Sequence, residues 1–249
     1  MPPEAGSAAG ALEPMPEDWR RALVVVAHPD DVEWGTAQAV ARWTSAGKQV
    51  AYLLATRGEA GIDTMSPEQA GPVREAEQRA AAAEVGVHTV DFLDHRDGVI
   101  EYGPALRRDI AVAIRRHRPE LLVTINHHGY WAPGSPNSPD HRAVGRATID
   151  AAADAANRWI FPPAAGEPEP WSGVRWVAVS ASTRAGHAVD ISGHRDRAVA
   201  SLAAHRSYLL ALRDEPPEQH AAHLIDEMQT TDPTLFDGHP YLAFELLTL

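Results

Sequence analysis

The sequence predicts an α/β fold: a Rossmann-like, mostly parallel sheet flanked by helices, followed by a C-terminal α+β cap. Strand-like and helix-like segments alternate through the first 160 of the 249 residues, as a series of βαβ units requires. Leu23-Val24-Val25-Val26 is a run of four aliphatic residues, which is typical of a strand buried on both faces of a parallel sheet. Gly47 and Gly86 each follow a segment with helical spacing, where a glycine is suited to end the helix.

The first part of the chain is expected to contain four strands, each followed by a helix. Apolar runs predict strands at residues 22–27, 49–55, 89–93 and 121–125. Helical spacing predicts helices at residues 32–46, 72–85, 105–117 and 140–159. These elements form a predicted core at about residues 21–161.

The composition changes after this core. Residues 162–170 are rich in Pro, Gly and Glu and form a predicted linker. A cap at about residues 171–249 is expected to contain strands at 174–180, 188–191 and 241–249 and helices at 194–212 and 218–228. We interpret residues 21–249 as a single domain made of core and cap. Residues 1–20 are expected to be a flexible N-terminal segment, because they are rich in Pro, Gly, Ala and acidic residues.

The composition excludes several classes of partner. Lys and Arg number 22 against 34 Asp and Glu, which gives a formal net charge of −12. Nucleic acids and anionic membranes are not attracted to such a surface. The sequence has no run of about 18 apolar residues that could span a membrane. Residues 1–20 also lack the regions of a signal peptide, so a cytoplasmic location is expected. Because the chain has no cysteine, any metal site must use His and carboxylate ligands.

The segment after the first strand carries the strongest functional signal. Ala27-His28-Pro29-Asp30-Asp31-Val32-Glu33 places one imidazole and two adjacent carboxylates at the carboxyl end of that strand, where open α/β sheets bind ligands. A dinucleotide-binding turn would have Gly-x-Gly-x-x-Gly at this position, and the two Asp carboxylates would repel a phosphate. We therefore interpret this turn as half of a metal site.

The second half is predicted at the start of helix 140–159, in Ser138-Pro139-Asp140-His141. The carboxyl ends of the first and fourth strands can lie side by side, so His28, Asp31 and His141 can bind one metal ion. Two histidines and one carboxylate leave a coordination position for water, as catalytic zinc requires. Asp30, beside these ligands, is the predicted general base towards that water. Zinc is the expected metal and iron(II) is the alternative.

Together, these motifs resemble those of the PIG-L/LmbE-like zinc N-deacetylases. That family includes deacetylases of mycothiol and bacillithiol synthesis, the glycosylphosphatidylinositol de-N-acetylase and deacetylases of antibiotic pathways. The resemblance covers about residues 22–153 and implies zinc on the three ligands above with Asp30 as the base. It also implies that Arg74, in Arg74-Glu75-Ala76-Glu77, contacts the substrate and that Asp97, in the loop after the third strand, binds sugar hydroxyls.

One position departs from the family pattern. Many members have His-Pro-Asp-His, in which the first histidine stabilises the oxyanion or protonates the amine, whereas this chain has Ser138 there. A serine is a weaker donor and cannot act as an acid at neutral pH. The role is therefore absent, left to the metal, or taken by His127, His128 or Tyr130, which precede it in the loop at residues 126–139.

Several predicted site residues also have a structural explanation. Asp140 can cap its helix or orient His141, and Tyr130 can stack on a sugar or anchor its loop. Glu33 is interpreted as a supporting residue and His205 as a histidine of the core. The predicted catalytic set is Asp30, His128 and Asp140, and the predicted substrate-binding set is Arg74, Asp97 and Tyr130.

The leading hypothesis is a zinc-dependent amide hydrolase that removes an acetyl or other acyl group from an N-acylated amino sugar or glycoside. An alternative keeps the chemistry but changes the substrate to a thiol conjugate or an antibiotic side chain. Another alternative is a catalytically silent module that binds metal or sugar, which the serine at position 138 favours and the acid at position 30 opposes. Linker and cap segments could pack between subunits, so we favour a homo-oligomer.

Overall fold

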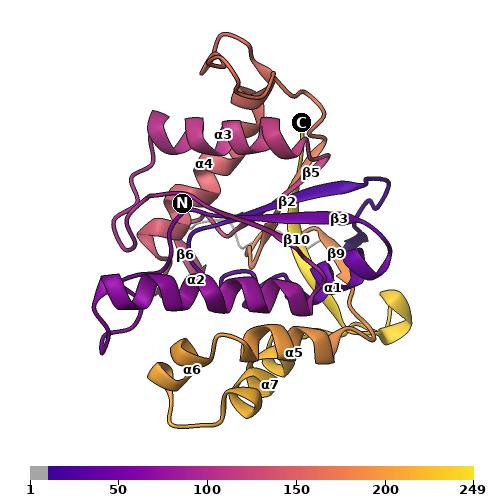
Figure 1. The fold of residues 1–249 in the computed structure, drawn as a ribbon. Helices are drawn as coiled ribbons and strands as arrows, with labels where there is room; N and C mark the ends of the chain where they lie inside the picture. The colour runs from indigo at the N-terminus through magenta and orange to yellow at the C-terminus, as the bar shows by residue number, and fades with distance from the viewer. Residues whose placement is uncertain (1–10) are drawn as a thin grey trace, which may run out of the picture.

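The buried strand β2 (Arg21–Val26) lies between β5 and β3 in an eight-stranded sheet with the order β1-β9-β10-β8-β5-β2-β3-β4 (Figure 1). The structure, a computed structural model, describes residues 11–249. The other strands of this sheet are β1 (Glu13–Pro14), β3 (Gln49–Leu54), β4 (Thr89–Phe92), β5 (Leu121–Ile125), β8 (Trp176–Ser180), β9 (His187–Asp190) and β10 (Tyr241–Thr248).

The strands β8, β5, β2, β3 and β4 run parallel to one another. Their carboxyl ends therefore share one edge of the sheet, where doubly wound folds bind ligands. β10 is antiparallel to both β8 and β9. The predicted α/β fold with a mostly parallel sheet is confirmed.

Helices cover both faces of the sheet, which explains why its central strands consist mostly of buried apolar residues (Figure 1). α3 (Pro104–His117) and α4 (Pro139–Ala156) pack on one face. α1 (Ala37–Ser45) and α2 (Pro67–Glu84) lie on the other face. A further layer packs against α1 and α2 and consists of α5 (Arg195–Ala203), α6 (Arg206–Leu212) and α7 (Pro217–Glu227).

Two predicted helices begin at other residues in the structure. α1 begins at Ala37 instead of residue 32, because residues 30–36 form turns that direct the acidic segment towards the site. α2 begins at Pro67 instead of residue 72, and the backbone N–H of Ser66 donates to the Gln69 side chain over 3.2 Å, which is half of a capping box. Pro72 lies inside the first turns of this helix.

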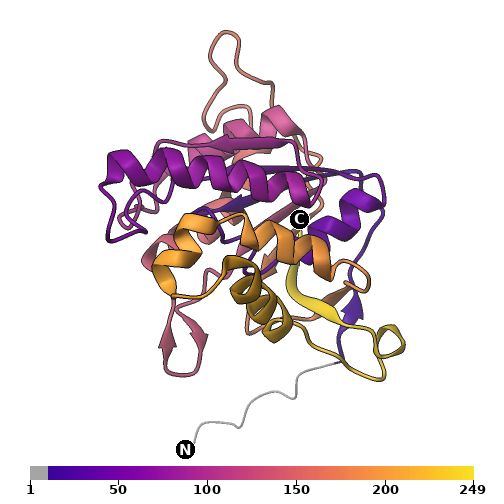
Figure 2. The same ribbon diagram turned by 60° about the horizontal axis from the view of Figure 1, so that its bottom comes forward.

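The loop after β5 contains a small hairpin of β6 (Tyr130–Ala132) and β7 (Ser135–Pro136). Figure 2 shows this hairpin extending from the body of the molecule, at the opposite end from the loop between α4 and β8. The segment at residues 126–139, which was expected to be a loop without regular structure, therefore contains a short β-hairpin.

The C-terminal region is less separate from the core than the predicted cap would be. β8 and β10 continue the main sheet beside β5, so only the helices α5, α6 and α7 form an additional layer. The single helix predicted at residues 194–212 is interrupted at Ala204 and His205. The interruption turns the His205 side chain, which is fully buried, towards the turn after β2.

The prediction of a flexible segment at residues 1–20 is wrong for residues 11–20, which the structure describes as part of the fold. Residues 1–10 of that segment lie outside the described residues. β1 pairs with β9 from Glu13, and the side chains of Met15 and Trp19 are buried in the core. None of the helices within residues 11–249 combines the length and the apolar character that crossing a membrane requires.

Candidate metal centre and active site

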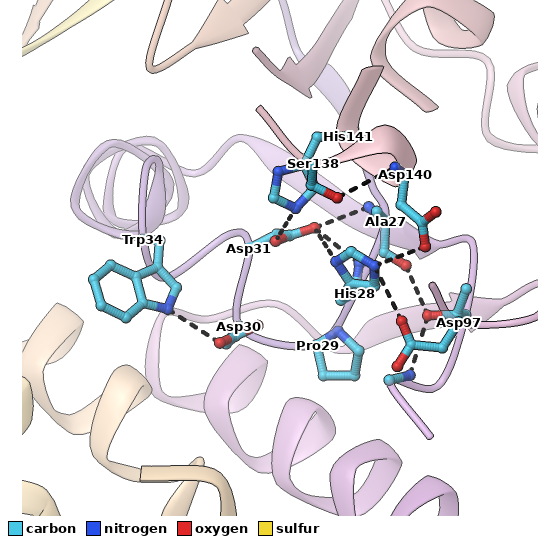
Figure 3. Close-up of polar contacts among 12 residues, drawn as sticks. Ala27, His28, Pro29, Asp30, Asp31, Trp34, Asp97, Ser138, Asp140 and His141 are labelled. Atoms are coloured by element: carbon cyan, nitrogen blue, oxygen red, sulfur yellow. Dashed lines mark hydrogen bonds and ion pairs between the residues drawn. The ribbon is translucent and has the colours of Figure 1, made fainter. Parts of the chain in front are cut away.

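The turn after β2 is held by one of its own carboxylates. Asp31 Oδ2 accepts hydrogen bonds from the backbone N–H groups of Ala27 at 3.0 Å and His28 at 2.8 Å. The other oxygen of Asp31, Oδ1, lies 3.0 Å from Nε2 of His141 (Figure 3). Asp31 therefore shapes the turn with one oxygen and faces the start of α4 with the other.

The start of α4 brings the second half of the predicted site to this turn. Ser138 is the N-cap of the helix, and its Oγ accepts from the backbone N–H of Asp140 at 3.2 Å. Nδ1 of His141 lies 3.3 Å from Oδ1 of Asn137. With a proton on Nδ1 donated to this amide oxygen, Nε2 of His141 keeps a lone pair on the side that faces Asp31.

His28 is oriented in the same manner by two carboxylates. Its Nε2 lies 3.1 Å from Asp140 Oδ2 and 3.2 Å from Asp97 Oδ1, and its Nδ1 lies 3.5 Å from Asp31 Oδ2 (Figure 3). In the neutral ring with its proton on Nε2, the lone pair of Nδ1 would face Asp31, where a metal ion would take the place of the second proton. Ligand atoms of His28, Asp31 and His141 all lie within 4.8 Å of one another. Two fixed imidazoles and one carboxylate, without a thiolate, fit zinc or iron(II).

A second group, His28 with Asp97 and Asp140, also has ligand atoms within 4.8 Å of one another. Its carboxylates already have backbone partners: Asp140 accepts from Gly98 N at 2.7 Å and Ile100 N at 3.0 Å, and Asp97 accepts from Ala60 N at 2.8 Å. The first group is therefore the better metal site. Asp140, only 1% exposed, lies behind His28 and does not line the cavity described below, so it orients His28 rather than the predicted His141.

The charges around these residues favour a bound cation. Burial disfavours the imidazolium form of His28, but the carboxylates of Asp31, Asp140 and Asp97 outweigh it and raise the pKa of His28 to about 12. Burial also opposes ionisation of Asp31, but the neighbouring His141 and His28 hold its pKa well below the usual range. The local field is thus strongly negative at the point where the ligand atoms meet.

Asp30 has quite different surroundings from its neighbour Asp31. Its backbone is in the left-handed region with a φ of +86°, and its N–H donates to Oε1 of Gln78 at 2.9 Å. Its carboxylate accepts from Trp34 Nε1 at 3.0 Å and from Arg74 Nη2 at 3.1 Å. Burial raises the pKa of Asp30 to about 6, although the Arg74 guanidinium opposes that shift. A carboxylate with this pKa can take up and return a proton near neutral pH.

Arg74 is 2% exposed and lies under the site. Besides Asp30, it donates to the carbonyl oxygens of Gly58 at 3.0 Å and Pro29 at 2.7 Å. A Cβ atom at Gly58 would lie 2.3 Å from Nη1 of Arg74, so this approach requires a glycine. The arginine therefore supports Asp30 and its turn, and a direct contact with substrate remains a prediction.

A buried polar network lies behind Asp30. Gln78 Nε2 donates to Oε1 of Glu33 at 3.3 Å, and Ser201 Oγ donates to the same oxygen at 3.0 Å. His205 Nε2 lies 3.3 Å from the other oxygen of Glu33. Glu33 thus supports the turn, and His205 is a core histidine, as predicted. Gln78 was not apparent from the sequence, because a glutamine in a helix carries no signal of its function.

The candidate ligands and Asp30 line a cavity of about 560 Å³. Its wall also contains Arg74, Asp97 and Ser138, which were predicted or discussed from the sequence. Sequence reasoning missed most of the remaining wall, which contains Trp34, Gly35, Gly61, Ile125, Trp131, Ser180, Ala181, Tyr208 and Met228. Of these, only Trp131 had an available signal, as an aromatic residue in the loop before the second motif.

The structure does not bring His128 or Tyr130 to this cavity, which corrects their predicted places. The Asn126 side chain accepts from the backbone N–H of His128 at 2.9 Å and turns the chain. The His128 ring then faces β10, with Nε2 2.7 Å from Glu245 Oε2. Tyr130 is 59% exposed on the hairpin and lines a different hollow together with His128. The His127 ring packs at a tilt against the His128 ring and does not line the cavity either.

Comparisons relate the chain to known proteins. Residues 23–152 match the family model described as PIG-L, GlcNAc-PI de-N-acetylase. The chain is 30% identical over 188 residues to a 1D-myo-inositol 2-acetamido-2-deoxy-alpha-D-glucopyranoside deacetylase from Thermomonospora curvata, covering 65% of this chain and 60% of the relative. It is 32% identical over 138 residues to a diacetylchitobiose deacetylase from Thermococcus kodakarensis, covering 54% of this chain and 49% of the relative.

Among solved structures, the N,N'-diacetylchitobiose deacetylase from Pyrococcus horikoshii is similar with a TM-score of 0.78 and 20% sequence identity. The superposition covers 93% of this chain and 85% of that one. At this identity the likeness establishes the fold. The chain spans between about half and three-fifths of the length of the two curated relatives described above.

Proposed function

The chain belongs to the PIG-L family of GlcNAc-PI de-N-acetylases, and from that premise we propose that it is a metal-dependent N-deacetylase. Its proposed substrate is an N-acylated amino sugar or glycoside, and the proposed reaction is hydrolysis of the amide to a carboxylic acid and a free amine. The activities named for its relatives in Thermomonospora curvata and Thermococcus kodakarensis support this class of substrate.

One observation carries the proposal. Two imidazoles and the Asp31 carboxylate converge, and each imidazole has its other nitrogen held by a side-chain oxygen. Asp30 lies beside this group on the wall of the same cavity. A divalent metal bound there supplies polarisation of the amide carbonyl and a lowered pKa for the attacking water. We propose zinc, with iron(II) as the alternative.

In the proposed reaction, Asp30 takes a proton from the attacking water as the oxygen adds to the amide carbon. The protonated Asp30 then gives this proton to the amine nitrogen as the C–N bond breaks. Trp34 and Arg74 hold the two carboxylate oxygens, which fixes the direction of both transfers. Because His128 faces Glu245 and Ser138 caps α4, Asp30 serves as both base and acid in this proposal.

The test is release of free amine from methyl N-acetyl-β-glucosaminide by protein loaded with zinc or iron(II). Asp30→Asn keeps the size of the side chain and its contact with Trp34, so we expect it to retain the metal. We expect its rate to fall by about a hundredfold or more. Asp63→Asn, on an exposed residue, is the matched control. Full activity of Asp30→Asn would refute the mechanism, and metal binding without turnover by the wild type would point to a binding module.

A further inference from the structure

The cavity beside the candidate metal ligands is much more apolar than the ligands themselves. Most of its exposed lining is apolar, and Trp34, Ile125, Trp131 and Met228 contribute to it. The Trp131 ring packs edge-on against His141, with the two ring centroids 5.3 Å apart. Trp34 is 36% exposed even though its N–H is held by Asp30. A volume of about 560 Å³ is within the range of sites for ligands larger than one small sugar.

Several polar side chains on the wall are already engaged with the protein. Ser138 Oγ accepts from the backbone of Asp140, and Ser180 Oγ donates to Thr124 O at 3.2 Å. Arg74 donates to two carbonyl oxygens and to Asp30. Arg74 Nη2 has both of its protons in use, and each serine has used one hydrogen-bonding position, so these three side chains offer few sites for a string of sugar hydroxyls across the apolar wall.

The charge of the wall also disfavours an anionic ligand. Arg74 is the only arginine or lysine among the described residues that line the cavity, and Asp30 already pairs with it. Asp30, Asp31 and Asp97 contribute carboxylates. Away from the position of the metal, a phosphate or carboxylate on the substrate would meet these carboxylates without an arginine or lysine that is free to pair with it, which is unfavourable in a partly desolvated site.

Part of the apolar lining lies on the side of the candidate ligands that faces away from Asp97. In Figure 3, Trp34 and Asp97 lie on opposite sides of His28 and Asp31. Tyr208 belongs to the side of Trp34, because its ring stacks on Arg74 with the guanidinium carbon 4.2 Å from the ring centroid. Arg74 and Trp34 both bind the Asp30 carboxylate.

We propose that the substrate is electrically neutral and carries an apolar substituent that packs against Trp34, Tyr208 and Met228 beside the scissile amide. This inference rests on the proposed function. The substituent is either the aglycone of the amino sugar or the chain of the acyl group, and both present the same chemistry to this surface.

A matched substrate series tests the proposal with zinc-loaded protein. The reference is methyl N-acetyl-β-glucosaminide; the aglycone arm uses the octyl and 4-nitrophenyl glycosides, and the acyl arm uses the N-octanoyl methyl glycoside. We expect kcat/KM to rise about tenfold or more in at least one arm, since each buried methylene can contribute a substantial factor. N-acetylglucosamine 1-phosphate is expected to fall below the reference.

The outcomes separate this proposal from the proposed function. A gain in one arm supports the inference and identifies the apolar group. Hydrolysis of the reference with no gain in either arm, or a preference for the phosphate, overturns the inference and leaves the N-deacetylase assignment intact. Absence of hydrolysis across the whole series, with metal bound, overturns both.

Two variants test the location of the apolar surface. Met228→Gln and Ala181→Asn each place an amide on the wall, and Asn is suited to the φ of +53° at position 181. We expect each to lower the preference for the apolar substrate about threefold or more. Leu210→Gln makes a comparable change on an exposed residue of α6 and is the control. Because Ala181 is also exposed, its variant should fold even if the Met228 variant does not, and an unchanged preference in it overturns the proposal.

Discussion

Two walls of the same cavity differ in origin and in chemistry. The core wall, defined by His28, Asp30, Asp31 and His141, comes from the turn after β2 and the start of α4. The cap wall, defined by Ser180, Ala181, Tyr208 and Met228, comes from the C-terminal region. The core wall is ionisable and fixed by hydrogen bonds, whereas the cap wall contains no ionised group at neutral pH.

The comparison teaches that the proposed chemistry belongs to the core wall, whereas the proposed selectivity is shared between the cap wall and Trp34 of the core. Within the core wall, even adjacent carboxylates differ, because Asp31 faces two imidazoles and Asp30 faces an indole and a guanidinium. The pKa of Asp31 is lowered while burial raises that of Asp30 to about 6. One carboxylate thus suits a metal ligand and the other a proton carrier.

The largest effect should come from breaking the core wall at a metal ligand. His141→Ala removes one of three candidate ligands, and we expect metal content to fall from about one ion per chain to near zero. His128→Ala is the informative control, because this histidine pairs with Glu245 away from the cavity. Elemental analysis of both proteins, purified without chelator, measures the difference. Equal metal loss in both variants would contradict the assignment of ligands.

The fold and the core wall were largely predictable from the sequence. Four consecutive aliphatic residues identified β2, and the sheet topology then placed the carboxyl end of β2 next to that of β5. Because both motifs follow parallel strands that pair directly, His28 and His141 meet although they are 113 positions apart. The local sequence pattern and the parallel topology together were therefore sufficient to predict that these two histidines lie close together.

The cap wall was not predictable, because its placement depends on tertiary contacts without a local pattern. The interruption of the helix at His205 occurs where that side chain reaches Glu33 in the turn after β2. That contact directs α6, and with it Tyr208, onto Arg74. The two adjacent histidines were equally misleading, since His127 and His128 come one residue after the end of β5 and yet do not line the cavity.

A smaller effect on metal binding is expected from changing Asp140, which holds the candidate ligand His28 in place. Asp140→Asn keeps the shape of the residue but weakens the charge that orients His28. We expect metal affinity to fall about ten- to a hundredfold, as for other residues that hold a ligating histidine. Competition with a chelator measures this change. Asp150→Asn, on the same helix, is the control, and an equal shift in both variants would indicate a general effect on α4.

The hydrogen bond that holds the backbone of Asp30 can be removed without changing a candidate metal ligand. Gln78→Leu leaves the Asp30 N–H without its acceptor, and we expect a loss of about 1–3 kcal/mol in the free energy of unfolding. Because Asp30 loses a constraint on its left-handed backbone, kcat should fall about tenfold while metal content stays unchanged. Urea unfolding and steady-state kinetics measure both effects. Unchanged kcat in a destabilised variant would show that Gln78 contributes to stability alone.

The smallest effect is expected where the cap wall meets Asp30. Tyr208→Phe keeps the ring on Arg74 and on the cavity wall but removes the hydroxyl beside the Asp30 carboxylate. The change removes a polar neighbour of that carboxylate, an effect of the size of a single hydrogen bond at about 0.5–1.5 kcal/mol, so kcat should fall by a factor of about two to ten. Tyr208→Ala also removes the ring and should in addition raise KM for apolar substrates. A loss in Tyr208→Phe as large as in Asp30→Asn would mean that the cap wall takes part in proton transfer, and the separation of chemistry from selectivity would then fail.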